Sequence, residues 1–426
     1  MESYSIYFMT EDDGIGINLQ PINEKTFNVY LELLTCFGDI EDNVIKISSE
    51  QQATDELKSR VAGFVEKYAD NHPILNRLKR KIVNLSSSEY FLVLESVVVE
   101  TSERLKLETY ISTLNNIENI TDLQSKFEEK MNALDNFSGD LLSKYNLIIP
   151  RNDRKTTVGN AKKENRCCRF CNKTMRDGVT FKKVAHAIPE GLGNKNIILG
   201  DECDNCNEFF GNNIEPALIE HLDIYRVFLG IKGKNGVPKI KYKNGHMQYE
   251  NNMSIVVSQG FKRVSDKEFT INLESTKSLT PAKLYKALCK ITLSTIDEKH
   301  MVDLKQTVKW LTCVDTPQLR LPRVAANVVH NGFSKVPQIV NYIRKIDDFG
   351  IPHIVSEFRI GSFVYVYIIP FSEKDTVDFI ADEEYEKFWD TFKHYRSIND
   401  WRFDCLDSIK EMSINENIRL VQNGQP

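Results

Sequence analysis

Two Cys-x-x-Cys pairs, about thirty residues apart, constrain this chain more than any other feature of its sequence. The first pair is Cys168 and Cys171, and the second is Cys203 and Cys206. Two intervening residues let both sulfur atoms of a pair face one ion, and four thiolates form the ligand set of a closed, tetrahedral zinc site. The sequence therefore predicts a structural Zn²⁺ with an apparent binding free energy on the order of 10–16 kcal/mol.

The remaining cysteines do not indicate disulfides. Cys167 could replace Cys168 as a ligand, but the spacing would become Cys-x-x-x-Cys, so Cys168 is the predicted ligand. The cysteine count is odd and the first residues do not resemble a secretory signal, which argues against a disulfide framework. The sequence also has no apolar run of the roughly 20 residues that a membrane helix needs. We therefore expect a cytoplasmic protein. The cysteines that lie singly in apolar surroundings are interpreted as buried apolar side chains: Cys36, Cys289, Cys313 and Cys405.

The segment between the two pairs reads as strand, loop, strand and helix. Val184, His186 and Ile188 alternate as strand residues do, and Pro189 ends the strand before a glycine-rich turn. The stretch "NIILG" predicts a second strand, and "CDNCNEFFGNNIE" a helix with Asn207 near its start. By itself, a histidine on such a strand is more often a half-buried residue than a catalytic one, and Asn207 could equally be a helix cap.

The stretches "AHAIPEGLGN" and "ECDNCNEFFGNNIE" resemble the HNH endonucleases, also called ββα-metal nucleases. The resemblance is closest to the branch framed by two Cys-x-x-Cys knuckles, because the knuckles, His-x-Ile-Pro, Leu-Gly-Asn and Cys-Asn occur in that order. It covers roughly residues 165–222. It implies a ββα-metal module and a metal-dependent endonuclease that hydrolyses phosphodiester bonds in nucleic acid.

The resemblance also implies roles for individual residues. His186 would be the general base that takes a proton from the attacking water, and Asn207 would be a ligand of a catalytic divalent ion, Mg²⁺, Mn²⁺ or another. An imidazole with an ordinary pKa of about 6.5 is largely free to accept a proton at neutral pH. We expect a backbone carbonyl of the glycine-rich loop to hold the other ring nitrogen. The structural zinc has no open coordination position, so the catalytic ion would be a second ion.

The chain departs from the common family pattern immediately before the histidine. Many HNH nucleases carry Asp, Glu or His there as a metal ligand, whereas this chain has Ala185. Either another carboxylate takes that role, or the site is weak or inactive. Glu215 and Glu202 are the favoured replacements among the nearby acidic residues, which also include Glu190, Asp201 and Glu208.

Charge is distributed unevenly along the chain. Residues 1–150 hold 25 acidic and 14 basic side chains, whereas residues 151–183 hold 11 basic and three acidic ones. A basic segment in an acidic chain can bind a polyanion, although a solvated linker would have the same composition. The basic residues on or beside the expected hairpin are predicted to contact phosphates: Arg169, Lys173, Arg176, Lys182 and Lys183.

The chain as a whole is predicted to be α+β. Its first expected parts are a largely helical domain after a short strand pair (residues 1–150) and a basic linker (151–166). The zinc-stapled HNH module (167–225) and an α+β domain (226–426) follow. In the last part, "KIKYKNGHMQYE" predicts a hairpin that turns at Asn244-Gly245. "SLTPAKLYKALCKITLSTI" predicts a helix, "FVYVYIIPF" a strand, and "DEEYEKFWDTFKHY" a terminal helix with an aromatic core face.

These observations leave two hypotheses about function. The first is a DNA endonuclease, with double-stranded DNA as the default substrate and RNA or single strands left open. Its large flanks suggest, by analogy, bacterial antiviral defence, with a homodimer or a protein partner in a defence complex as further expectations. The second is a non-catalytic zinc-ribbon module that binds nucleic acid or a protein partner. No membrane partner is expected.

Overall fold

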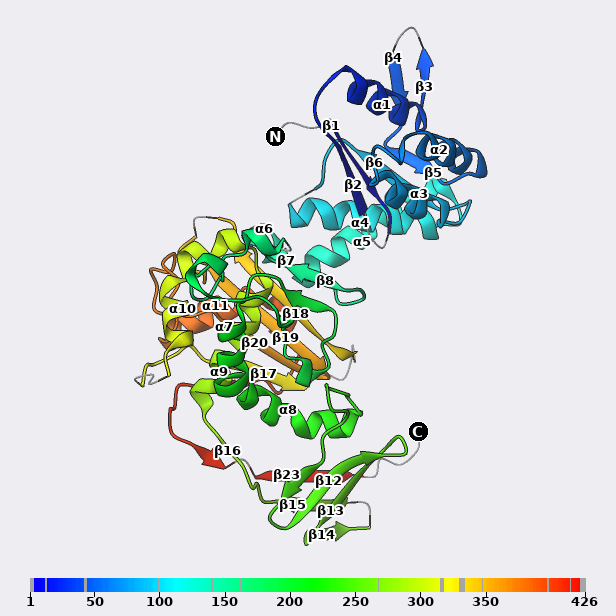
Figure 1. The fold of residues 1–426 in the computed structure, drawn as a ribbon. Helices are drawn as coiled ribbons and strands as arrows, with labels where there is room; N and C mark the ends of the chain where they lie inside the picture. Colours follow the sequence, from blue (N-terminus) through cyan, green and yellow to red (C-terminus); the bar gives the residue numbers. More distant parts are fainter. Residues whose placement is uncertain are drawn as a thin grey trace. The chain divides into compact units, whose positions relative to one another are not determined.

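The computed structural model describes residues 4–421 except 12–13, 42–43, 99, 139–140, 161, 267, 315–317, 329–333, 347, 397 and 414. The chain forms two compact units, Met1–Ser143 and Lys144–Pro426. Both combine helices with small sheets, which confirms the predicted α+β class (Figure 1). Across the described residues, every helix is too short or too polar to cross a membrane.

The first unit packs helices against a four-stranded sheet of order β2-β1-β6-β5. The predicted strand pair is confirmed, because β1 and β2 pair antiparallel with Ile6 opposite Ile17. Asn23 and Thr54 cap α1 and α2 by accepting hydrogen bonds from backbone N–H groups in the first turns. The strands are β1 (Tyr4–Met9), β2 (Gly14–Leu19), β3 (Gly38–Glu41), β4 (Val44–Ile47), β5 (Glu50–Gln52) and β6 (Tyr90–Leu94). The helices are α1 (Glu24–Thr35), α2 (Asp55–Tyr68), α3 (Leu75–Val83), α4 (Thr101–Asn116) and α5 (Leu123–Ser138), with α6 (Leu141–Lys144) at the end of the unit.

The second unit is built on an antiparallel six-stranded sheet and one buried helix. The sheet order is β21-β17-β20-β19-β18-β7, from β7 (Tyr145–Ile148), β17 (Val324–Val328), β18 (Ser334–Arg344), β19 (Ile354–Gly361), β20 (Phe363–Ile368) and β21 (Arg402–Asp404). The predicted helix is α9 (Pro281–Thr295), preceded by Thr280. Tyr367 of the sheet donates a hydrogen bond to the carbonyl of Leu288, which helps to hold α9 on the sheet (Figure 1). All residues of α9 except Lys283 are buried, so other parts of the unit cover its remaining faces.

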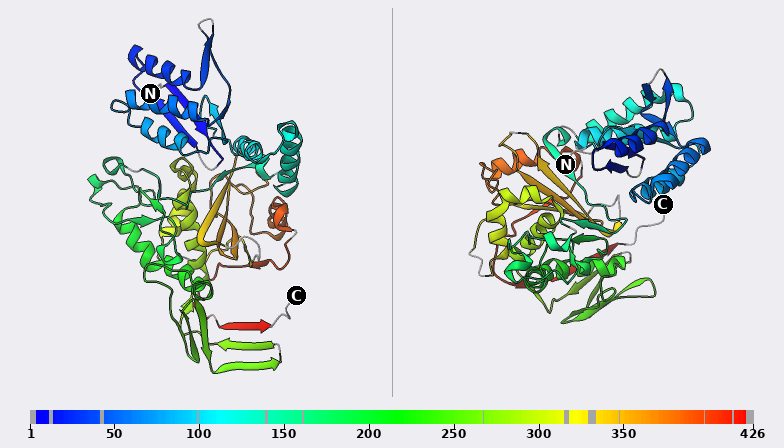
Figure 2. Two further views of the ribbon diagram at one scale, coloured as in Figure 1. Left: turned by 90° about the vertical axis from the view of Figure 1, so that its right-hand side faces the viewer. Right: turned by 45° about the horizontal axis from the view of Figure 1, so that its top comes forward.

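Three smaller sheets and two further helices complete the predicted hairpin region and the C-terminus. Tyr242 pairs with Gly245, so the predicted hairpin is present, but its two-residue turn is Lys243-Asn244 and not the expected Asn244-Gly245. Neither residue of the expected pair has a positive φ. The last strand pairs with β15, so the end of the chain returns to the 260–273 hairpin (Figure 2). The strands are β11 (Ile240–Tyr242), β12 (Gly245–Glu250), β13 (Met253–Ser258), β14 (Gly260–Ser265), β15 (Glu268–Leu273), β16 (Ser278–Leu279), β22 (Met412–Ser413) and β23 (Glu416–Val421), and the helices α8 (Glu215–Leu229) and α10 (Lys305–Thr312).

Two further sequence expectations about secondary structure differ from the structure. The expected terminal helix is divided into α11 (Asp382–Trp389) and α12 (Lys393–Arg396), and strands follow it. Its aromatic face is core, because Tyr385, Phe388 and Trp389 are buried. The segment 151–166, expected to be a linker, contributes β8 (Thr156–Val158), which pairs in parallel with β10 (Ile197–Leu199). A polar segment can form such a strand because the hydrogen bonds are between backbone groups, which every sequence carries.

Candidate active site

Four cysteine side chains converge at the start of helix α7 (Asp204–Asn213). The sulfur atoms of Cys168, Cys171, Cys203 and Cys206 all lie within 4.8 Å of one another. Cys203 precedes the first residue of α7, and its backbone N–H donates a hydrogen bond to the sulfur of Cys168 at 3.4 Å. The four predicted ligands therefore lie close enough together to hold one metal ion, and Cys167 is not a member of this cluster.

The four sulfur atoms fit a zinc ion. Cys171 and Cys203 have their sulfurs 3.7 Å apart, and a tetrahedron with Zn–S bonds of about 2.3 Å has edges of about 3.8 Å. The pKa of the Cys168 thiol is lowered to about 5 by a hydrogen bond from Cys206 and by neighbouring backbone N–H groups. These contacts favour the thiolate of Cys168, whereas burial raises the pKa of Cys203 to about 11 and the hydrogen bond to Cys168 raises that of Cys206. A zinc ion held by four thiolates supplies structural stability and no open coordination position.

The two knuckles are tied to the buried helix α9 by Arg169. Its guanidinium donates to the carboxylate of Asp201 at 2.9 Å through both Nε and Nη2. Nη1 donates to the carbonyls of Leu293 and Ile296 at the end of α9, at 2.7 and 3.1 Å. The Arg169 side chain is fully buried, so its predicted phosphate contact has to be corrected. The sequence could not reveal this, because the partner on α9 is more than a hundred residues away.

The hairpin between the knuckles places His186 on its first strand, as predicted. His186 of β9 (Ala185–His186) lies opposite Ile198 of β10 in an antiparallel pair. Asn194 closes the turn: its amide donates to the carbonyls of Ile188 and Ile197, and its carbonyl oxygen accepts from the N–H of Ile197. Asn194 is completely buried, so these bonds replace the backbone pairing that the turn lacks. This accounts physically for the asparagine of the Leu-Gly-Asn motif.

His186 sits at the edge between the protein interior and solvent. Its side chain is 21% exposed, and its Nε2 lies 3.9 Å from an oxygen of Glu190. Its Nδ1 is buried, and no hydrogen-bond partner for it occurs among the described residues. The expected carbonyl of the glycine-rich loop therefore does not hold the ring. Burial lowers the pKa of His186 below its ordinary value, so that the imidazole is neutral and able to accept a proton at pH 7.

Lys290 of α9 lies next to this histidine. The sequence motif did not identify this residue. Its ammonium donates to the carbonyl oxygen of His186 at 3.1 Å. It also pairs with Glu215 at 3.0 Å and with Glu202 at 3.3 Å. The Lys290 side chain is fully buried, and although burial opposes its charge, the two carboxylates raise its pKa. The ammonium therefore remains charged at the centre of the site.

The candidate ligands of a catalytic ion differ in accessibility. Glu202 is fully buried beside Lys290 and does not reach solvent. This burial raises the pKa of Glu202 to about 7. Glu215 begins α8, because the chain breaks helical geometry at Ile214, and its side chain remains 16% exposed. Asn207, in the first turns of α7, is half-buried. Glu215 and Asn207 thus carry partly accessible oxygen atoms, whereas the carboxylate of Glu202 is enclosed.

The other predicted phosphate contacts lie on the surface. Lys183 pairs with Glu208 at 3.0 Å, and both side chains are more than half exposed. Such an exposed pair contributes little to stability and can open for another anion. The side chains of four predicted contacts are exposed: Lys173, Arg176, Lys182 and Lys183.

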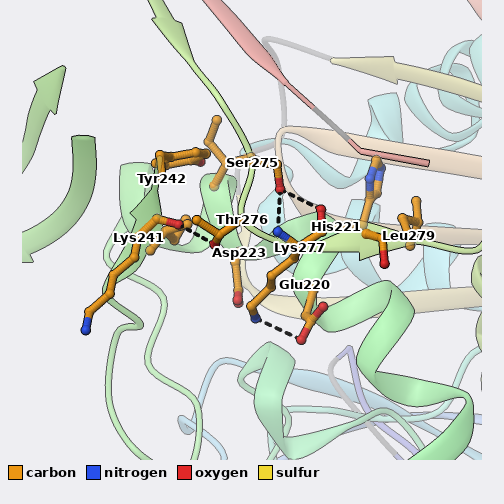
Figure 3. A pocket seen from close by; sticks show the side chains of 12 residues that line it. Glu220, His221, Asp223, Lys241, Tyr242, Ser275, Thr276, Lys277 and Leu279 are labelled. Carbon is orange, nitrogen blue, oxygen red and sulfur yellow. Dashed lines mark hydrogen bonds and ion pairs between the residues drawn. The ribbon is translucent and has the colours of Figure 1, made fainter. Parts of the chain in front are cut away.

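A separate small cavity lies along α8 and does not include His186. Figure 3 shows Glu220 paired with Lys277 at its edge, with a distance of 2.8 Å between the charged atoms. The cavity has a volume of about 60 Å³ and is also lined by His221 and Asp223. This volume holds a few water molecules and no nucleotide.

Comparison with known proteins identifies the region that carries this site. Residues 168–223 match the family of HNH endonucleases. No curated protein and no solved structure matches the chain. The matched region contains the four thiols, His186 and Glu215, and it ends well before Lys290. The similarity to HNH endonucleases is therefore carried by residues 168–223, which include the four-cysteine cluster, within a longer α+β chain.

Proposed function

We propose that this protein is a metal-dependent endonuclease that hydrolyses phosphodiester bonds in nucleic acid. The observation that carries the proposal is His186: a partly exposed imidazole with a lowered pKa, on the hairpin of a segment that matches the HNH endonucleases. In this role His186 accepts the proton of the water that attacks phosphorus. The neighbouring Glu190 carboxylate, 3.9 Å away, stabilises the imidazolium that results.

Glu215 and Asn207 are the side chains proposed to hold the catalytic ion. A bound Mg²⁺ or Mn²⁺ would polarise the phosphate and offset the charge on the leaving oxygen. Glu215 is suited to this because one oxygen is held by Lys290 while the side chain still reaches solvent. Zn²⁺ bound by the four thiolates is proposed as a structural ion only.

Double-stranded DNA is the proposed substrate, recognised mainly through its phosphates. Lys173, Arg176, Lys182 and Lys183 are exposed on the same segment as His186. Contacts to phosphate carry no sequence information, so weak sequence preference is expected from this segment alone. RNA and single strands are the alternative substrates.

The flanking regions are proposed to control the nuclease. Residues 1–150 and 226–426 would serve activation, assembly or targeting, as a homodimer or with a protein partner, in cytoplasmic defence against foreign DNA. The large flanks outside the matched residues 168–223 support this only by analogy with other nucleases.

A second candidate function is a non-catalytic zinc module that binds nucleic acid or a protein. It is favoured by Ala185, which has no ligand atom in its side chain and is buried before His186. It is also favoured by Glu202, whose carboxylate is already paired with Lys290. Under this hypothesis the zinc segment would bind without cutting.

A plasmid-nicking assay separates the two candidates. The wild-type protein is incubated with supercoiled DNA and Mg²⁺, Mn²⁺ or EDTA, alongside His186→Ala and a control, His246→Ala, in strand β12. The endonuclease proposal requires cleavage that EDTA and His186→Ala abolish and that His246→Ala leaves intact. Zinc content and thermal melting show that each variant is folded. Equal behaviour of wild type and His186→Ala would leave only the binding module.

A further inference from the structure

Lys290 makes an unusual set of contacts for a side chain on a buried helix. A lysine ammonium has three hydrogens and no acceptor. Three oxygen atoms surround it, from Glu215, Glu202 and the backbone of His186, at 3.0, 3.3 and 3.1 Å. The aromatic ring of Phe210 lies 5.7 Å from the same nitrogen. The ammonium therefore donates to the carbonyl of His186 and lies between two carboxylates, although neither oxygen of Glu202 accepts a hydrogen bond from a described residue.

The three partners come from three different elements of the candidate site. His186 lies on β9, Glu202 directly precedes the zinc ligand Cys203, and Glu215 begins α8. Lys290 lies outside residues 168–223, on a helix that packs against the six-stranded sheet. One side chain from the rest of the chain therefore connects the parts of the HNH segment to each other.

We propose that Lys290 is a positioning residue, which fixes the backbone of His186 and the carboxylate of Glu215 relative to one another. This inference rests on the proposed function, because it assigns Lys290 a role in the same site. It also means that the HNH segment is incomplete without α9.

The short strand that carries His186 explains why such a contact is needed. β9 has two residues, and β10 is the strand with which it pairs. The imidazole makes no hydrogen bond from Nδ1 to any described residue. The bond from Lys290 to the carbonyl of His186 therefore supplies a restraint on the side away from β10. Displacement of a catalytic group by about 1 Å can reduce a rate by about 100-fold.

Glu202 has a supporting role in this arrangement. Its carboxylate is fully buried beside Lys290, which places a second negative charge against the ammonium. Of the two carboxylates beside the ammonium, only that of Glu215 is partly exposed. The proposal thus separates Glu202, which compensates the lysine, from Glu215, which faces the reaction.

The test uses a double variant, Lys290→Met/Glu202→Gln. This change removes one positive and one negative charge, so the net formal charge of the cluster is unchanged. The carboxylate left without Lys290 is that of Glu215, which is partly exposed. The single variant Lys290→Met is not used alone, because it leaves two carboxylates without their cation, which destabilises the fold. The control is Lys286→Met: Lys286 is also buried on α9, but its ammonium donates to the carbonyl of Cys313.

The expected result is a fall in kcat of about 30-fold or more for the double variant, with KM within about 2-fold of wild type. Zinc content should stay at the wild-type level, and Lys286→Met should keep wild-type kcat if folded. A folded, zinc-loaded double variant with wild-type kcat would overturn the proposal, because charge balance would then be the only role of Lys290.

A second readout does not depend on cleavage. The ring signals of His186, assigned by His186→Gln, are recorded by NMR with labelled histidine. They should broaden or split in the double variant and remain single in Lys286→Met. If the wild type fails to cut DNA, the proposed function fails while this measurement still tests Lys290. Unchanged His186 ring signals in the double variant would contradict the positioning role.

Discussion

Two parallel hydrogen bonds, both of 2.9 Å, join the guanidinium of Arg169 to the carboxylate of Asp201. Both side chains are buried. Arg169 lies inside the first cysteine knuckle, and Asp201 lies just before the second. The same guanidinium binds the last carbonyls of α9, where a positive charge is favoured by the helix dipole. This pair therefore links the four-cysteine cluster to the core of the second unit.

The Arg169→Met variant should be destabilised strongly. It leaves the buried carboxylate of Asp201 without its partner, and such a loss costs about 3–5 kcal/mol. The free energy of unfolding can be measured by urea titration with zinc present. Lys173→Met, an exposed basic residue of the same knuckle, is the matched control and should change stability by less than about 0.5 kcal/mol. Equal stabilities of the two variants would contradict a structural role for the Arg169–Asp201 pair.

Cys203→Ser should remove zinc from the protein. The serine oxygen replaces one of the four converging sulfurs, so the site can no longer close around the ion. Zinc measured by mass spectrometry should fall by about one ion per chain, and residues 168–206 should become sensitive to protease. Cys167→Ser is the control, since Cys167 is outside the cluster, and it should keep the metal. Loss of zinc in both variants alike would argue for a different ligand set.

The pH dependence of cleavage should report His186. Burial lowers its pKa, so the acid limb of kcat/KM should have its midpoint below the ordinary value of about 6.5. Activity then rises with pH as the base loses its proton and stays high at neutrality. Glu190→Gln removes a charge that raises this pKa, and should move the limb to still lower pH. A limb that does not respond to Glu190→Gln would point to another titrating group.

Acid should destabilise the second unit through His221. Burial lowers the pKa of His221 to about 4, with the charge of Arg402 as a smaller cause. As the pH falls below about 6.5, this histidine binds a proton in the unfolded state but not in the native state. The free energy of unfolding therefore decreases until the pH reaches about 4. The loss from this residue is about 3 kcal/mol. Urea titrations of wild type and His221→Phe between pH 7 and 4 should differ in slope, and parallel curves would count against this assignment.

Binding of DNA should depend on salt through the exposed basic residues. Each phosphate contact contributes about 0.9 to the slope of log K against log salt concentration. Lys182→Ala or Arg176→Ala, at exposed positions, should each reduce that slope by about one contact and weaken binding to all sequences alike. The measurement is fluorescence anisotropy with labelled duplex DNA, in EDTA to prevent cleavage. An unchanged slope would exclude that residue from the interface.

Much of the local structure follows from short patterns. The hairpin around residue 244 was predicted, although its turn lies one residue earlier than expected and has no positive φ at Asn244 or Gly245. The helix at 281–295 has an early proline where its missing N–H costs nothing. The division between α11 and α12 was missed, because the aromatic spacing continues through residues 390–392. Strand β8 was missed since its sequence is polar and it is paired through backbone atoms with a partner forty residues later.

The sequence alone determined the four thiols and placed His186 on a strand, because both depend on residue type and close spacing. The tertiary structure decided which of the long charged side chains are buried. Lys290 and Arg169 look like surface residues in any local window, yet both are buried, since distant segments bring Glu202, Glu215 and the end of α9 within reach. A charge is stable in the interior only when oppositely charged or polar groups surround it, and which groups do so depends on how distant segments pack.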